Sequence, residues 1–105
     1  MQINVTQNDS VLTLALEGRL DSATSPGLEN ALKNSLEEID SLVLDFSKVD
    51  YVSSAGLRSL LGAHKQMSAQ GNMKITNANE GVMEIFKMTG FANVLSIEQA
   101  LDQNL

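Results

Sequence analysis

The first twenty residues alternate apolar and polar side chains, which is the two-residue period of a half-buried β-strand. The polar Asn4 separates Ile3 from Val5, and three leucines occupy alternate positions within 11–18. The polar segment QNDS (7–10) has the composition of a turn. This pattern predicts two antiparallel strands joined by a short turn, with the second strand ending at Gly18.

A helical pattern and another strand pattern follow. Apolar residues recur at helical spacing over 28–39. The polar connector before them offers Ser25 as the N-cap and Pro26 as the first helical residue. The run SLVLDF (41–46) is almost continuously apolar, which is typical of a parallel strand covered on both faces. We expect this strand to lie at the centre of the sheet.

The second half of the chain continues this alternation. A left-handed cap at Gly71 is expected to end the second helix, and the third helix is expected to end near Gly90. The elements predicted in this half are a helix over 57–67, a strand over 73–76, a helix over 82–88, a strand over 93–96 and a helix over 97–104. The whole order predicts a single α/β domain over 1–105, with a mostly parallel mixed β-sheet, a leading antiparallel hairpin and helices packed on the sheet.

Charge and hydropathy exclude several functional classes. The chain carries 7 Lys and Arg against 13 Asp and Glu, a formal net charge of -6, and it has no basic cluster that could neutralise phosphates. We therefore expect no nucleic-acid binding. The apolar runs fall short of the roughly 18 residues of a membrane span, and the first residues lack the pattern of a signal peptide. These features predict a cytoplasmic protein without direct membrane insertion.

The residue types that carry much of enzyme chemistry are scarce. The chain has no cysteine and one histidine, which excludes disulfides, thiolate zinc sites, cysteine nucleophiles and a histidine-rich metal site within one chain. The seven glycines are dispersed and form neither a phosphate-cradling loop nor a nucleophile elbow. We expect no metal and no cofactor.

Two adjacent hydroxyls lie in the segment YVSSAGLR (51–58), at the carboxyl end of the predicted central strand, where sites collect in open α/β sheets. Ser53 and Ser54 have a structural interpretation, because serine is a preferred N-cap and Gly56 relieves crowding in a tight turn. Nucleophilic catalysis is disfavoured, because the one imidazole, His64, lies about ten residues further along the predicted helix. We therefore expect no enzymatic activity. A helix N-terminus does stabilise an anion, so a serine there is suited to carry a phosphate as a switch.

Three further segments occur in a definite order: LEGRLDSAT (16–24), LVLDFSKVDYVSSAGLRSLLGAHK (42–65) and IFKMTGFANVLSI (85–97). Together they resemble the STAS domain family, in particular the bacterial anti-sigma factor antagonists. The first is similar to the family's G-x-L-D segment, the second to its central strand followed by a serine motif and GL, and the third to its closing apolar residues around TG. The resemblance covers nearly the whole chain and implies a STAS-like fold.

The resemblance also implies a function, which is partner switching. In the family, the unphosphorylated antagonist binds an anti-sigma factor that is also a serine protein kinase, and this frees the sigma factor. Phosphorylation of one serine ends the complex, and a serine phosphatase restores it. The phospho-acceptor of the family falls on Ser54, two residues before Gly56. Ser53 replaces an aspartate common in well-studied members and Ala55 replaces a second Ser or Thr, which leaves the identity of the kinase open.

The partner-binding residues that the resemblance implies are Asp21, Ser53, Ser54, Ala55, Gly56, Leu57 and Arg58. We expect Ser54 to cap the following helix while its hydroxyl stays exposed. The small residues Ala55 and Gly56 would let the partner approach closely. Structural alternatives stay open for three members: Asp21 as a turn-capping aspartate, Leu57 as a core leucine and Arg58 as a solvated charge.

Two other functions remain open beside the switch. One is a non-switching STAS subunit of a lipid-transport or stress-signalling assembly. The other is a nucleotide-binding STAS module, which the missing phosphate-cradling loop disfavours. Stoichiometric phosphorylation of Ser54 would separate the switch from both.

Overall fold

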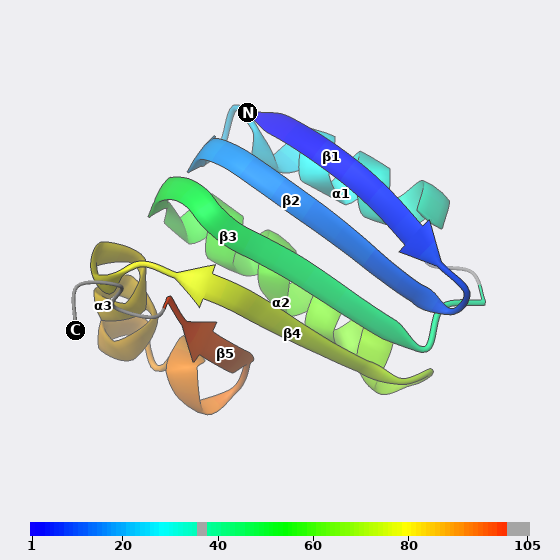
Figure 1. Ribbon diagram of the computed structural model, residues 1–105. Coiled ribbons are helices and arrows are strands. Elements are labelled where there is room, and N and C mark those ends of the chain that lie inside the picture. The colour runs from blue at the N-terminus through cyan, green and yellow to red at the C-terminus, as the bar shows by residue number, and fades with distance from the viewer. Residues whose placement is uncertain (36–37, 101–105) are drawn as a thin grey trace.

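A computed structural model describes residues 1–35 and 38–100 of the chain. These residues form one five-stranded sheet, three α-helices and a short 3-10 helix (Figure 1). In chain order the elements are β1 (Gln2–Asn8), β2 (Val11–Leu20), α1 (Ser25–Ser35), β3 (Ser41–Val52), α2 (Ser54–Ser68), β4 (Asn72–Ala78), α3 (Glu80–Thr89), η1 (Phe91–Asn93) and β5 (Ser96–Gln99). The strands are ordered across the sheet as they are along the chain.

The sheet has the predicted mixed character. β1 and β2 form the antiparallel hairpin, and every other neighbouring pair of strands is parallel. The expectation of a mostly parallel sheet with a leading hairpin is therefore confirmed. β2 does not end at Gly18, however, because its pairing with β3 continues to Leu20 opposite Val52.

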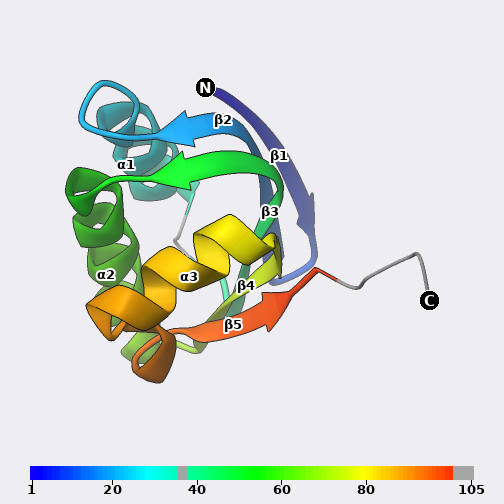
Figure 2. The same ribbon diagram turned by 90° about the vertical axis from the view of Figure 1, so that its left-hand side faces the viewer.

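All three helices lie on the same side of the sheet (Figure 2). Each parallel connection steps to the next strand in the same direction, and right-handed crossovers of this kind place every helix on one face. Leu42, Leu44 and Phe46 of β3 are buried beneath the helices, whereas Val43 and Asp45 on the opposite face are half-buried. The expectation that the central strand is covered on both faces is therefore wrong, although β3 does lie at the centre.

The central strand is also longer than its apolar run. β3 pairs with β4 only from Ser41 to Asp45, but it stays paired with β2 as far as Val52. Two register shifts interrupt that longer pairing. Residues 47–52, which follow the predicted strand segment 41–46, therefore also belong to the strand, and they carry the start of α2 to the end of β2.

The core fills the space between the sheet and the helices. Leu28 of α1 and Leu60 of α2 are completely buried there. α3 reaches the same core through Phe86, whose ring centroid lies 6.2 Å from that of Phe46 on β3. Packing against the strands, more than helix propensity, is what stabilises helices as short as these.

Gly71 does not act as the predicted left-handed cap. α2 ends at Ser68, its C-cap Ala69 has right-handed backbone angles, and the glycines with positive φ are Gly18 and Gly90. A Cβ atom at position 71 would overlap the carbonyl oxygen of Asp40. Glycine is therefore required there by a close approach of two backbone segments. Gly90 does end α3 as expected, with φ of 80° in the left-handed region.

The start of α1 also differs from the prediction. Ser25 is the first helical residue and not the N-cap, and its buried Oγ donates a hydrogen bond to the carbonyl oxygen of Asp21 at 2.7 Å. Pro26 is accordingly the second residue of the helix. α1 ends at Ser35, so Ile39, which was expected in the helix, lies beyond it in the core. Residues 36 and 37 of the predicted helix lie outside the described residues.

The last described segment is assigned differently as well. β5 spans Ser96–Gln99 and so replaces the start of the helix predicted over 97–104. The strand predicted over 93–96 begins instead at its final residue, because the 3-10 helix η1 occupies 91–93. Residues 101–104 of the predicted helix lie outside the described residues. The secondary structure of so short a segment depends on which strand it can pair with, here β4.

Candidate functional site

The N-terminus of α2 separates the roles of the two adjacent serines. Ser53 is the N-cap, with extended backbone angles, and its Oγ accepts a hydrogen bond from the N–H of Gly56 at 3.3 Å. Ser54 is the first helical residue, and its side chain is exposed. The expectation that Ser54 caps the helix is therefore wrong, while the expectation that its hydroxyl is exposed is confirmed.

Contacts with β2 fix the position of this helix start. The N–H of Ser53 donates a hydrogen bond to the carbonyl oxygen of Leu20 at 2.8 Å. A Cβ atom at position 56 would lie 2.7 Å from that same oxygen and 3.1 Å from Cγ1 of Val52. Gly56 is therefore a packing requirement of the chain itself. Leu57, at 5% exposure, belongs to the core, which bears out its structural alternative.

Asp21 organises the turn that follows β2. Its Oδ1 accepts hydrogen bonds from the N–H of Ala23 at 3.0 Å and from the N–H of Thr24 at 3.2 Å. The Thr24 hydroxyl donates a further one at 3.2 Å. Partial desolvation raises the pKa of Asp21, but these hydrogen bonds and the nearby charge of Arg19 outweigh it and hold the pKa below 3.8. The turn-capping alternative for Asp21 is therefore shown, and its second carboxylate oxygen, Oδ2, takes no part in the hydrogen bonds of the turn.

Arg19 is part of this site although sequence reasoning did not select it. Its Nε lies 3.7 Å from Oδ2 of Asp21, and its guanidinium carbon lies 4.6 Å from the centroid of the Tyr51 ring. Arg19 is the register partner of Tyr51 across β2 and β3. Residues 19 and 21 flank the buried Leu20, so strand alternation is the signal that could have placed their side chains on one side.

The structure thus brings together most of the predicted residues. Leu20 and Val52 are register partners, so the turn of Asp21 and the start of α2 lie side by side. Arg58 follows Ser54 by one helical turn and is exposed. We use the name Ser54 surface for the accessible residues at this end of the sheet: Arg19, Asp21, Tyr51, Ser53, Ser54, Ala55 and Arg58. Gly56 and Leu57 lie buried behind it.

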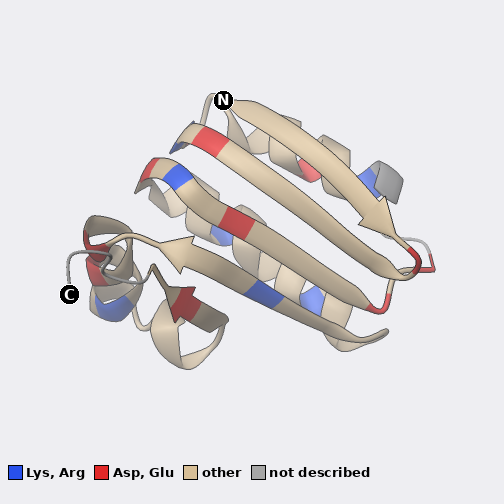
Figure 3. Cartoon of the chain, viewed as in Figure 1, with Lys and Arg blue, Asp and Glu red and all other residues tan. Residues whose placement is uncertain are grey.

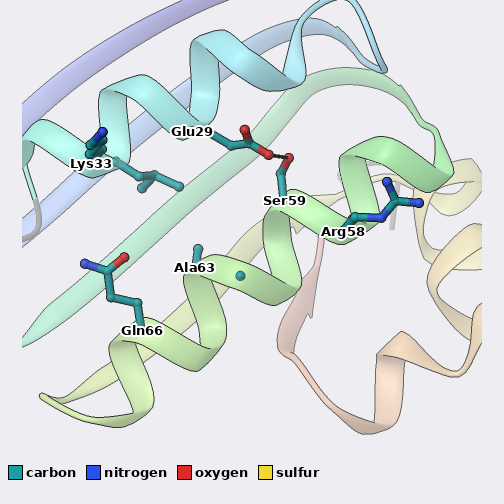
Figure 4. Close-up of a pocket in the computed structure, with 8 residues that line it drawn as sticks. Glu29, Lys33, Arg58, Ser59, Ala63 and Gln66 are labelled. Carbon is teal, nitrogen blue, oxygen red and sulfur yellow. Dashed lines mark hydrogen bonds between the residues drawn. The ribbon is translucent and has the colours of Figure 1, made fainter.

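A pocket of about 300 Å³ opens between α1 and α2, next to this surface. Its walls carry one acidic and two basic side chains, Glu29, Lys33 and Arg58. Figure 4 shows Glu29 and Ser59 pointing toward each other, and the Ser59 Oγ donates a hydrogen bond to Oε1 of Glu29 at 2.6 Å. This hydrogen bond ties α1 to α2, because Glu29 lies on α1 and Ser59, which is 5% exposed, lies on α2.

The imidazole of His64 is too far from Ser54 to act as its base in nucleophilic attack. His64 follows Ser54 by ten residues in the same helix, a separation of about 15 Å along the helix axis. Among residues 1–35 and 38–100, no group of three or more His, Cys, Asp or Glu side chains is placed to hold a metal ion. Over the same residues, no helix has the length and apolar character needed to cross a bilayer.

Comparison with known proteins assigns this architecture to a family. The family model of the STAS domain matches residues 2–104. This chain belongs to the STAS domain family. The STAS chain is 31% identical over 99 residues to BtrV of Bordetella bronchiseptica, which is described as a candidate anti-sigma factor antagonist, and the match spans 92% of this chain and 85% of BtrV.

Another relative and a solved structure agree with this family. The STAS chain is 26% identical over 98 residues to the anti-sigma-B factor antagonist of Bacillus subtilis, across 92% of this chain and 90% of that protein. The crystal structure of an anti-sigma factor antagonist from Mycobacterium paratuberculosis superposes with a TM-score of 0.84 at 22% identity, over 96% of this chain and 87% of the other. These matches confirm the STAS-like fold. Phosphorylation of Ser54 and the partner-binding residues stay predictions.

Proposed function

We propose that this STAS chain is an anti-sigma factor antagonist and that Ser54 is its phosphorylation switch. The relatives named as antagonists support the first part, since each match spans more than nine-tenths of this chain. The observation that carries the second part is that the two serines have different roles at the start of α2. Ser53 supplies the cap, so the exposed Ser54 hydroxyl can be modified without removing a hydrogen bond on which the helix depends.

A phosphate on Ser54 suits its position in the helix. The first turn of α2 contains no acidic residue, so the positive end of the helix dipole is not already compensated there. Arg58, one turn further along the same helix, provides a cation at the spacing at which helical side chains meet. A phosphate adds about 1.5 to 2 negative charges, which changes the docking surface while the fold is retained.

The partner in this proposal is an anti-sigma factor with serine protein kinase activity. Its unphosphorylated complex with the antagonist uses the Ser54 surface, and a serine phosphatase reverses the modification. Gly56 and Leu57 contribute by holding the helix start against β2, since both are buried. The accessible residues Asp21, Ser53, Ala55 and Arg58 make the contacts, together with Arg19 and Tyr51.

The test uses purified kinase-type anti-sigma factors encoded in the genome that encodes this chain. Binding is measured by calorimetry without ATP, and modification is measured by intact-protein mass spectrometry after incubation with Mg-ATP. We expect one kinase to bind the parent chain and to add one phosphate, which peptide mapping places on Ser54. Ser54→Ala should bind without being modified, and Ser54→Asp should bind at least about tenfold more weakly.

Ser96→Asp is the matched control, because Ser96 is an exposed serine on β5, an edge strand of the sheet. This variant carries the same charge change and should bind as the parent does. The switch is ruled out if the binding kinase leaves Ser54 unmodified and also binds Ser54→Asp as tightly as the parent. The antagonist assignment itself is ruled out if no kinase-type anti-sigma factor of the set binds.

A further inference from the structure

The free edge of β1 is unusually open to strand pairing. β1 is the terminal strand of the sheet and pairs with β2 through seven consecutive residues without a register shift. Six of its seven residues are exposed, and only Ile3 is half-buried. A regular strand at the end of a sheet presents unpaired N–H and C=O groups along its outer side.

The usual devices that protect such an edge are missing from β1. The sequence QINVTQN contains no charged residue and no proline, and Figure 3 shows the strand without either charge colour. The opposite edge of the sheet, β5, differs in charge, length and regularity. β5 has four residues, its pairing with β4 is interrupted by a register shift, and Glu98 on it forms an ion pair with Lys74 at 3.3 Å. Charge, shortness and irregularity are ways in which proteins block edge pairing.

One apolar side chain in the middle of this edge strand is exposed. Val5 is 52% exposed. Val5 is the register partner of the fully buried Leu14, so it lies on the helix side of the sheet but is not covered there. An added strand next to β1 would cover this side chain.

We propose that β1 is a homodimerisation edge, at which two copies of this chain pair their β1 strands antiparallel about a two-fold axis. The sheets of both copies then join into one continuous sheet. The absence of charged residues from β1 favours a second copy as the occupant. Two copies of this strand can pair without placing like charges opposite each other. The outer edge of β1 faces away from β2 and β3, whose ends carry the Ser54 surface. The dimer therefore does not depend on the proposed switch.

The sequence of β1 also selects the register of this pairing. With the axis at Asn4, Ile3 of each copy faces Val5 of the other, Gln2 faces Thr6, and Asn4 faces its own copy. A shift that moves the axis between two residues would place apolar side chains opposite polar ones on the wrong face of the sheet. Moving the axis to Val5 would place Ile3 opposite Gln7, and moving it to Ile3 would leave only three strand residues of each copy paired.

The dimer is expected to be weak and dependent on salt. One strand edge buries less surface than a standard protein interface, and each copy carries a net charge of -6. Added salt screens the repulsion between the copies and should strengthen the association. Sedimentation velocity of the full chain, from about 10 μM to about 1 mM, covers the affinity range of such small interfaces.

Cysteine cross-linking tests the register, because the chain has no cysteine of its own. Asn4→Cys would place two thiols directly opposite each other, within the reach of a disulfide. Thr6→Cys is the matched control, since four residues of offset separate the two thiols by about 13 Å. We expect a covalent dimer under mild oxidation for Asn4→Cys and little for Thr6→Cys. Equal or greater cross-linking of Thr6→Cys overturns this register.

A pair of charge variants tests the edge itself. Asn4→Lys places two lysines opposite each other and should raise the dimer dissociation constant at least tenfold, which is about 1.4 kcal/mol. Asn93→Lys makes the same change at an exposed residue of η1, which contacts β5 at the other edge. This control lowers the net negative charge equally and should dimerise as well as the parent or better. A monomer at about 1 mM in high salt, or equal loss in both variants with folding confirmed by circular dichroism, overturns the proposal.

Discussion

The N–H of Ser53 donates a hydrogen bond to the carbonyl oxygen of Leu20 at 2.8 Å, and this contact joins the end of β3 to the end of β2 immediately before Ser54. It holds the backbone of Ser53 extended, which is the conformation that an N-cap residue needs. The neighbouring serine is thereby left as the first residue of α2, with its hydroxyl in solvent. A contact between two strands therefore decides which of two adjacent serines is available for modification.

The two glycines of α2 should respond oppositely to alanine. Gly56→Ala places a methyl group 2.7 Å from the Leu20 carbonyl oxygen and 2.8 Å from its Cγ, which should lower the free energy of unfolding by about 2 kcal/mol. Gly62→Ala meets nothing within 4 Å and should raise it by about 0.5 to 1 kcal/mol, because alanine is the better helix former. Urea denaturation followed by circular dichroism measures both. Equal effects of the two variants would show that the helix start is not packed against β2.

The two serines should differ in their effect on stability. Ser53→Ala removes the cap to the N–H of Gly56 and should lower the free energy of unfolding by about 0.5 to 1 kcal/mol. Ser54→Ala should stay within about 0.5 kcal/mol of the parent, because its side chain is exposed. Ser53→Asp keeps an acceptor at the cap and serves as the control that restores stability. A larger loss for Ser54→Ala than for Ser53→Ala would contradict the assignment of the cap.

Gly71 should tolerate replacement by alanine less well than Gly90, the glycine that ends α3. Gly71→Ala sets a methyl group against the backbone of Asp40, and neither segment can yield without disturbing the paired strands β3 and β4. We expect a loss of about 3 kcal/mol in the free energy of unfolding. Gly90→Ala, at a φ of 80° with open space around it, should cost about 1 kcal/mol through backbone strain alone. Thermal and urea unfolding of both variants test this ranking, and the reverse order would refute the close approach.

Asp21 should make stability depend on pH in the acidic range. Its folded-state pKa lies below 3.8, so the ionised carboxylate stabilises the fold above that pH and loses its contribution as the pH falls through the folded-state pKa. The stability difference between the parent and Asp21→Asn should therefore be constant near neutral pH and shrink in acid. Carboxyl carbon NMR should give a titration midpoint below 3.8 for Asp21. Thr24→Val, which lacks the hydroxyl donor, should raise that midpoint, and an unchanged midpoint would show that the Thr24 hydroxyl does not contribute.

The periodic patterns were sufficient for the elements that pack through one face. The leading hairpin, the central position of β3 and the end of α3 at Gly90 follow from local alternation and residue type. The resemblance of three segments to a family supplied Asp21 and Ser54 as site residues. The contact between Arg19 and Tyr51 could not be predicted, because two register shifts between β2 and β3 determine which residues face each other.

By itself, the sequence determined the alternation of strands and helices, the acidic charge and the presence of two hydroxyls before a helix. Only the tertiary structure decided which hydroxyl is exposed, which face of the sheet is covered and why Gly56 and Gly71 are glycines. The physical reason is that periodicity and capping preference are local properties of the chain. A cap, a covered face and a forbidden Cβ depend instead on backbone from distant segments, here the Leu20 and Asp40 carbonyl groups.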